Sequence, residues 1–255
     1  MRLTSKPHFT LGLVILFLSS CGGGGGGGSS NSTVTGTAAT GAAIPGGAVT
    51  AVCSGGVGSA QTATDGTFTL TISTGGTTPC LLKVVSGSTT LYSAAYSGQA
   101  VANITPITNM IVANVLSEDP AVSFSSAASG GVPATLTAAN INSAVLVVKA
   151  ALTSAGVSLP DNIDPLSSSF TAANGSKSGD SLDLAIDAAM SAFTAAGVTV
   201  NQVSLALKTA NVTTAATKIQ TAAPSGTTIS YTGLTSATTC NGACISLSAP
   251  SDDSN

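Results

Sequence analysis

The chain has 255 residues, enough for two modest domains. Only 7% of its residues are charged and its mean hydropathy is positive, which argues against a disordered chain. After residue 20 it contains five lysines, ten acidic residues and neither Arg nor His, a charge balance of 5 − 10 = −5. This composition excludes the basic surface that nucleic acids require and the imidazole of Ser-His-Asp or Cys-His catalysis, so we predict a protein that is not an enzyme and binds no nucleic acid.

The first residues have the features of a secretory signal peptide. A basic start precedes the apolar segment from Phe9 to Leu18, which is too short to span a bilayer as a mature helix. The run Leu18-Ser19-Ser20-Cys21 resembles the bacterial lipobox, which implies a lipoprotein signal peptide at 1–20 and a lipid, palmitate included, on Cys21. The protein would then be a lipoprotein whose lipid is its contact with the membrane. Gly22 follows the anchor, and its resemblance to known sorting signals favours the outer membrane.

Residues 21–32 are rich in Gly and Ser and predict a flexible tether, with a reach of roughly 18 Å. Once Cys21 is assigned to lipid, four cysteines remain, an even number typical of an oxidising compartment. They are Cys53, Cys80, Cys240 and Cys244. Three pairings are open, and proximity favours Cys53 with Cys80 and Cys240 with Cys244. The second pair predicts an irregular, cysteine-stapled tail over residues 223–255.

Residues 33–105 predict an all-β domain. Thr67–Ile72 alternates strictly between polar and apolar residues, and Asp65-Gly66 before it is a two-residue hairpin signal that pairs this strand with residues 59–64. Cys53 and Cys80 fall on the apolar faces of two further alternating strands, the second of which turns Lys83 outward. We therefore expect a β-sandwich with a disulfide buried between its two sheets.

The motifs Gly36-Thr37, Ile44–Ala51 and Thr62–Leu70 resemble the carboxypeptidase regulatory-like domain, with its pattern of Gly, Gly-Ala-x-Val and Asp-Gly-x-Phe. The resemblance covers about 70 residues and implies a transthyretin-like or immunoglobulin-like β-sandwich, without implying peptidase activity. The segment Asn103–Asn109 is similar to one that follows this domain in uncharacterised proteobacterial lipoproteins. Domains of this fold are also grouped with carbohydrate-binding-like sandwiches, an analogy that suggests glycan binding.

After residue 105 the apolar period changes from two to about 3.6, which predicts a mainly helical domain over residues 106–222. Thr105 and Pro106 begin a first helix that Pro120 stops, and a Ser/Gly/Ala-rich loop follows over 123–132. Further helices are expected over about 138–155 and 180–196, each ending in a Gly-Val Schellman motif, and over 199–210 after a Thr199–Gln202 capping box. The overall prediction is an α+β protein.

Five aspartates gather in sequence around the segment 174–179. They are Asp161, Asp164, Asp180, Asp183 and Asp187. Their hard carboxylate oxygens predict a weak calcium site, although the order of an EF-hand loop is absent and Lys177 lies among them. The competing interpretation is structural, because acids in the first turn of a helix complement its dipole. Beyond this calcium no cofactor is expected.

Tyr92 and Tyr96 lie near the end of the predicted sandwich, where they would form a small platform for stacking a sugar, or else be half-buried edge residues. These observations predict a lipid-anchored cell-envelope protein, periplasmic or surface-facing, with a non-catalytic binding or scaffolding role. Its partners would be glycan, peptidoglycan or envelope proteins. The alternatives are a glycan-binding module at the cell surface and, less favoured, a hydrolase built on the aspartates.

Overall fold

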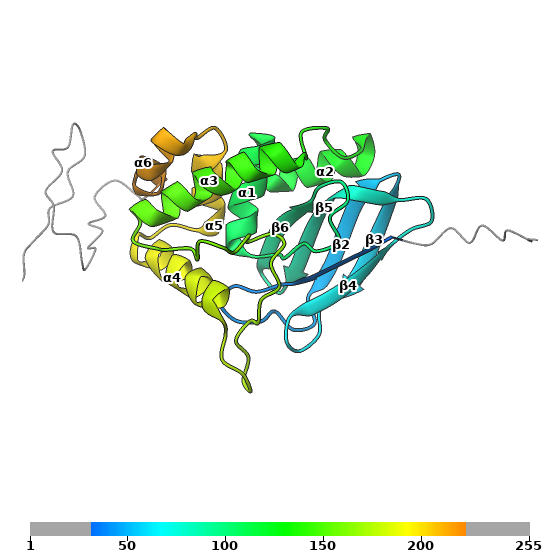
Figure 1. The fold of residues 1–255 in the computed structure, drawn as a ribbon, viewed down its shortest axis with the longest axis horizontal. Helices are drawn as coiled ribbons and strands as arrows, with labels where there is room; N and C mark the ends of the chain where they lie inside the picture. The colour runs from blue at the N-terminus through cyan, green and yellow to red at the C-terminus, as the bar shows by residue number, and fades with distance from the viewer. Residues whose placement is uncertain (1–31, 223–255) are drawn as a thin grey trace, which may run out of the picture.

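The computed structural model describes residues 32–222, which form a sheet flanked by helices (Figure 1). Its strands are β1 (Thr33–Thr37), β2 (Ala48–Ser54), β3 (Gly56–Gln61), β4 (Thr67–Ile72), β5 (Thr77–Ser86) and β6 (Thr89–Ala95). Together they make one antiparallel sheet in the order β1-β4-β3-β2-β5-β6. The predicted signal peptide, most of the tether, the 223–255 tail and the cysteines Cys21, Cys240 and Cys244 lie outside the described residues.

The two faces of the sheet follow from the alternation of residues along each strand. Phe68, Leu70 and Ile72 of β4 are all buried on the inner face, as predicted, while the threonines between them are exposed on the outer face. The register carries this division across the sheet. One row of outer-face partners takes a residue from each strand: Thr33, Thr71, Ser59, Thr50, Lys83 and Tyr92.

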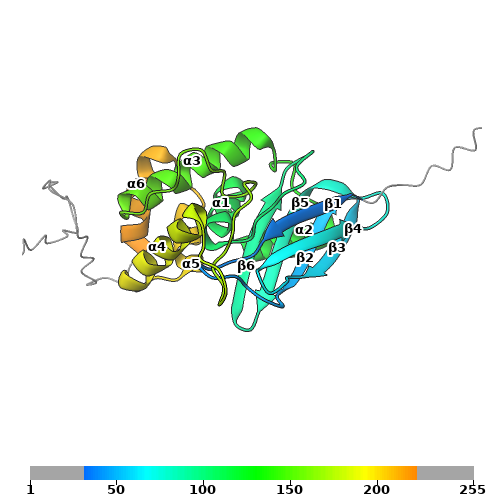
Figure 2. The ribbon, with the colours of Figure 1, turned by 60° about the horizontal axis from the view of Figure 1, so that its bottom comes forward.

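The α+β class is confirmed, but the predicted two-sheet sandwich is not, because all six described strands belong to one curled sheet. The chain after β6 returns to the far edge of this sheet and runs parallel to β1 (Figure 2). There Thr35 N–H donates to Ala100 O at 2.8 Å, and Ala102 N–H donates to Thr35 O at 2.8 Å. This pairing of β1 with the segment after β6 depends on tertiary structure, which the periodicity of a single strand does not specify.

The predicted Cys53–Cys80 disulfide is present. Cys53 of β2 and Cys80 of β5 are direct cross-strand partners, with Cα atoms 4.0 Å apart, and both are buried on the inner face. The bond therefore joins two neighbouring strands of one sheet, and the expectation that it links two sheets is wrong. The two cysteines are 27 residues apart in sequence. In the chain-entropy model, closing such a loop contributes about 3.5 kcal/mol to the free energy of unfolding.

The predicted hairpin between β3 and β4 is also present, with a longer turn than the Asp-Gly signal indicated. Ala63 N–H donates to Thr67 O at 2.8 Å, and Gly66 N–H donates back to Ala63 O at 3.0 Å. These bonds enclose Thr64, Asp65 and Gly66, with Gly66 at φ +79°. A three-residue loop with glycine in the left-handed region is a common hairpin connection.

The helices in the described residues are α1 (Pro106–Leu116), α2 (Pro120–Gly130), α3 (Ala138–Ser154), α4 (Ser181–Ala195), α5 (Val200–Leu207) and α6 (Val212–Ala222). Thr105 caps α1 with Pro106 at its first position, and the Thr199–Gln202 capping box opens α5, both as predicted. Beyond α3, Val157 N–H donates to Leu152 O at 2.9 Å across Gly156, which is the predicted Schellman ending. The equivalent bond from Val198 to Phe193 follows α4.

Two stretches differ from the sequence-based expectation. The predicted loop over 123–132 is mostly helix α2, because Asp119 caps it, Pro120 occupies its first turn and Phe124 supplies a buried anchor. Residues after Leu207 form a separate helix, α6, whose start is held by a 3.0 Å hydrogen bond from Thr214 N–H to the side chain of Asn211. The apolar pattern of α6 is weak in the sequence, but Ala215 is buried against the rest of the fold.

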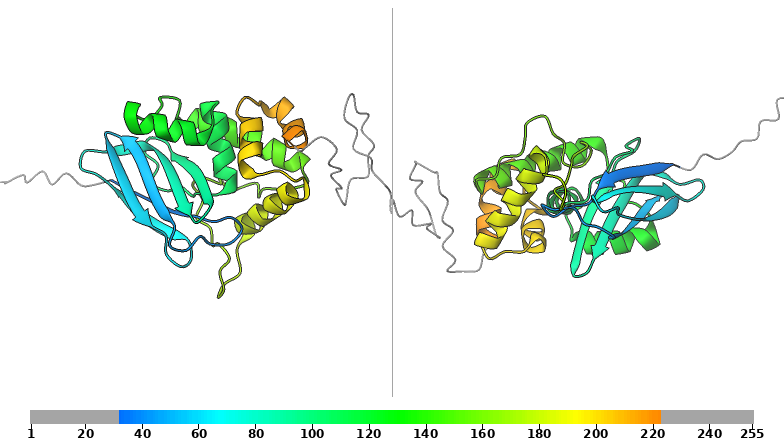
Figure 3. Two further views of the ribbon diagram at one scale, coloured as in Figure 1. Left: turned by 180° about the vertical axis from the view of Figure 1, so that it is seen from behind. Right: turned by 90° about the horizontal axis from the view of Figure 1, so that it is seen from below.

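The sheet and the helices share one hydrophobic core. Val52, Leu81 and Ala94 on the outer face of the sheet pack with the buried residues of the helices, while the inner face has a second core of its own. The helices gather at one side (Figure 3), where α1 packs on β6 and α2 packs on β5 and β2. The outer face of β3 and β4 is consequently left uncovered.

No single helix among residues 32–222 is both long and apolar enough to cross a bilayer. Helices α4 and α5 meet the length and composition requirement only as a pair, and they are bent by 94° at the break between them.

Candidate functional site: a groove on the outer face of the sheet

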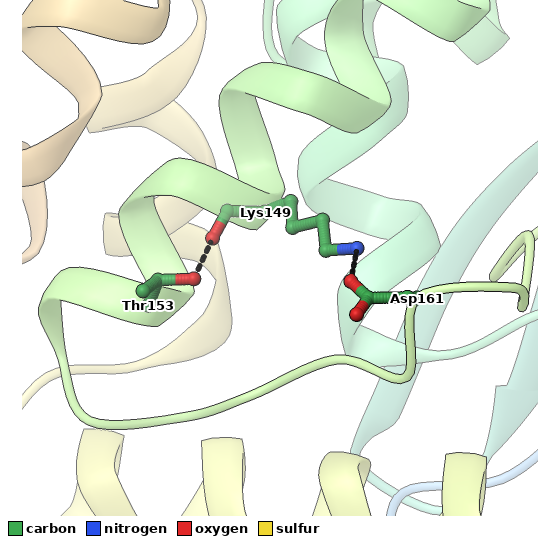
Figure 4. Close-up of polar contacts among 3 residues, drawn as sticks. All are labelled: Lys149, Thr153 and Asp161. Carbon is green, nitrogen blue, oxygen red and sulfur yellow. Dashed lines mark hydrogen bonds and ion pairs between the residues drawn. The ribbon is translucent and has the colours of Figure 1, made fainter.

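The first two predicted calcium ligands have local structural roles. Asp161 Oδ1 accepts a 2.9 Å ion-pair contact from Lys149 Nζ, and this charge-assisted bond lowers the pKa of Asp161 (Figure 4). Asp164 Oδ1 accepts a hydrogen bond from Leu166 N–H at 2.9 Å, and its Oδ2 accepts one from Ser167 Oγ at 2.6 Å. Asp161 therefore joins helix α3 to a loop, and Asp164 holds a turn.

The other three aspartates lie in the first two turns of α4 or cap it, and two of them, Asp180 and Asp183, hold the loop that precedes the helix. Asp180 caps the helix by accepting from Leu182 N–H at 3.0 Å, and its second oxygen accepts from Thr171 N–H at 2.8 Å. Asp183 is fully buried, and its Oδ2 accepts from Ala173 N–H at 3.0 Å. Asp187 is exposed on the next turn of the helix.

Asp183 has an unusual environment. Its Oδ1 atom is buried and accepts no hydrogen bond from the described residues. Burial raises the pKa of this carboxyl, the Ala173 N–H opposes that effect, and the charges of Asp187 and Asp180 add to it.

The five aspartates are not brought together as a calcium site. Within residues 32–222, no group of three or more Asp, Glu, His and Cys side chains is placed to hold a metal ion. The physical reason is that the backbone N–H groups and the Lys149 ammonium already engage four of the carboxylates. The structural interpretation of these residues describes their contacts better than the calcium prediction does.

Neither tyrosine forms an open platform. Tyr92 and Tyr96 are partly buried and pack against the core formed by the helices. The Tyr92 ring lies 5.8 Å from the ring of Phe124, and burial, with a smaller effect of the Asp119 charge, raises the pKa of Tyr92. Tyr92 does, however, stand beside Lys83 in the sheet register, at the margin of a groove.

This groove is the structure's best candidate for a binding site. It has a volume of about 660 Å³ and lies on the outer face of β2, β3 and β4, beside helix α2. It is shallow and open to solvent, so a bound ligand would stay partly exposed. The lining side chains are Thr50, Val52, Val57, Ser59, Thr71, Ser73, Lys83 and Phe124.

The wall of the groove carries a cation. Lys83 Nζ lies 4.8 Å from the centre of the Phe124 ring, a distance typical of a cation–π contact. Among the described residues Lys83 has no carboxylate within ion-pair distance, and no acidic side chain lines the groove. An aromatic ring therefore positions the ammonium, and no carboxylate in the described part of the chain forms an ion pair with it.

The floor of the groove combines hydroxyl groups with an exposed apolar side chain. Thr50, Ser59 and Thr71 are neighbours in the cross-strand row, and the hydroxyl of Thr50 is buried without a hydrogen-bond partner in the described part of the chain. Val57 is 60% exposed and supplies an apolar contact on this floor. The lining contains one titratable side chain, Lys83, so the arrangement suits binding of a ligand.

Sequence reasoning noted Lys83 as outward-facing but gave it no role, and it missed Thr50 and Phe124. The alternation of β2 and β5 could have placed Thr50 and Lys83 on the same face, whereas Phe124 was assigned to a loop. Comparison with known protein families, with curated proteins and with solved structures gives no match for this chain.

Proposed function

We propose that this protein is a lipid-anchored component of the cell envelope that binds a ligand in the groove on the outer face of its sheet. The anchoring rests on the lipobox-like run that ends at Cys21. The observation that carries the binding role is the uncovered groove, with the exposed Val57 on its floor and, in its wall, Lys83, which has no ion-pair partner within residues 32–222. A concave site that combines a cation, hydroxyl groups and an apolar contact is the default candidate for a ligand site.

Glycan binding is the form of this role that the lining favours. Hydroxyl groups both donate and accept hydrogen bonds, as sugars do, and those of Ser59, Thr71 and Ser73 line the groove. The resemblance to the carboxypeptidase regulatory-like domain, and through it to carbohydrate-binding-like folds, agrees with this role. On that relationship the curled sheet would be a variant of the sandwich, with residues 101–104 completing the second layer.

The binding role is tested with full-length protein in detergent against purified peptidoglycan sacculi and a panel of bacterial and plant glycans. Val57→Glu places a negative charge in the groove, and Leu184→Glu makes the same kind of change at an equally exposed site on α4. We expect saturable binding that Val57→Glu weakens and Leu184→Glu leaves unchanged. Absence of saturable binding, or equal loss in both variants, would contradict the proposal.

The anchoring is tested separately in cells. Cys21→Ser is expected to abolish incorporation of a palmitate label and to release the protein from the membrane fraction. An unchanged label and an unchanged membrane-bound fraction would refute lipidation. Protease treatment of intact and lysed cells then distinguishes a surface location from a periplasmic one.

A further inference from the structure

We propose that the groove takes a short acidic glycan, one of whose carboxylates pairs with Lys83. This inference rests on the proposed binding function and names the ligand class for the same site.

Charge complementarity points to an anionic group on the ligand. Lys83 is the titratable side chain of the groove lining, and the Phe124 ring 4.8 Å away holds its ammonium without neutralising it. A bound carboxylate would form the charge-assisted contact that no acid in the described residues supplies. A lone ammonium in a chain of net negative charge suits one carboxylate on a short ligand better than a long polyanion.

The floor of the groove indicates that the rest of the ligand is a sugar. Strands β2 and β3 are interior to the sheet, so their backbone groups are paired with neighbouring strands and are not free to add an extended peptide as a further strand. The hydrogen bonds available from the floor come from the hydroxyls of Ser59, Thr71 and Ser73. Val57 offers an exposed apolar contact for the C–H face of a sugar ring.

The test uses full-length protein in detergent and measures the dissociation constants of two matched probes, a trimer of galacturonic acid and a trimer of galactose. Lys83→Met removes the groove cation, and Lys177→Met removes an exposed lysine from the loop before α4. We expect the acidic trimer to bind more tightly than the neutral one. Lys83→Met should weaken acidic binding about 10-fold, leave neutral binding nearly unchanged and abolish the preference, whereas Lys177→Met should behave as wild type.

The outcomes separate this inference from the function on which it rests. Saturable binding of both trimers with equal affinity, unaffected by Lys83→Met, overturns the acidic-glycan assignment while leaving a glycan-binding groove. If neither trimer binds but sacculi or other glycans bind in a way that Val57→Glu weakens, the acidic-glycan assignment is overturned and the binding role stands. If a short peptide with a free carboxylate binds as tightly and with the same Lys83 dependence, the ligand class is peptide and the assignment to glycan is wrong. Unchanged melting temperatures confirm that the variants are folded.

Discussion

Asn109 and Ser204 are 95 residues apart in the chain, yet the Asn109 Nδ2 group donates a 2.8 Å hydrogen bond to Ser204 Oγ in the buried interior. The other end of the same amide accepts from Tyr92 N–H at 3.0 Å. One side chain of α1 thus joins strand β6 to helix α5. The predicted boundary near residue 105 therefore falls inside a connected polar and apolar network.

Replacing Asn109 with Ala is expected to lower the free energy of unfolding by about 2–3 kcal/mol, because it leaves the Tyr92 N–H and the Ser204 hydroxyl buried without partners. Ser204→Ala removes one bond and should cost about 1 kcal/mol. Urea unfolding followed by circular dichroism measures both values. If neither substitution changes the free energy of unfolding measurably, the Asn109 amide does not hold the sheet and the helices together.

The disulfide makes a second prediction. The double variant Cys53→Ala/Cys80→Ala is expected to lose about 3.5 kcal/mol of stability through the larger conformational entropy of its unfolded chain. Chemical denaturation of the oxidised protein, the reduced protein and the variant provides the comparison. Because the cysteines pair within one sheet, we expect the reduced protein to keep its β-sheet circular dichroism signal; loss of that signal would show that the sheet requires the bond.

Asp183 predicts a specific dependence of stability on pH. Burial raises its pKa in the folded protein, so the native state binds this proton more tightly than the unfolded chain does. The ionised, buried Asp183 carboxylate therefore lowers the free energy of unfolding by its full amount above the raised pKa. This loss of stability is relieved as the pH falls through the raised pKa towards the ordinary pKa of aspartate. In Asp183→Asn the amide oxygen can still accept from Ala173 N–H, and this contribution is absent.

The measurement is the melting temperature of the wild type and of Asp183→Asn between neutral and mildly acidic pH. The advantage of the variant, relative to the wild type, should shrink as the pH falls. Asp187→Asn, an exposed neighbour whose charge adds to the raised pKa of Asp183, should give a smaller change of the same sign. A difference between wild type and Asp183→Asn that is constant with pH would contradict the assignment.

Thr50 separates stability from binding. Thr50→Val removes a buried hydroxyl that has no hydrogen-bond partner, with little change of shape, so we expect the free energy of unfolding to rise by about 1 kcal/mol. The same change should leave glycan binding unchanged, because a buried hydroxyl does not reach the ligand. Thr71→Val, at an exposed position in the same row, should leave stability unchanged. A less stable Thr50→Val protein would show that the hydroxyl is satisfied within the fold.

Local patterns predicted most of the elements. Strict alternation placed Phe68, Leu70 and Ile72 on one buried face, and capping residues placed the starts of α1 and α5. Helix α2 was missed because its sequence is small and polar apart from a few apolar residues, of which Phe124 is the anchor. Its stability depends on packing against the sheet, which no local window contains.

The candidate site was harder to predict for the same reason. Its residues come from β2, β3, β4, β5 and α2, and only the strand order brings them together. The aspartates drew attention because they are adjacent in sequence, although the backbone already engages most of them. Lys83 is a cation in an otherwise apolar strand, a pattern visible in the sequence. Its place in a groove wall beside Phe124 is visible only in the fold.

The strand β1 is hydrogen-bonded on both sides, to β4 along one edge and to residues 100–104 along the other. If the chain is held at its N-terminus, a pulling force enters the fold along the axis of this strand. Such a force loads the lateral hydrogen bonds together in shear, instead of opening them one after another as peeling would. Under such a load β1 would act as a mechanical clamp, and single-molecule extension from the N-terminus should show a higher rupture force than extension that peels a strand from the edge of the sheet.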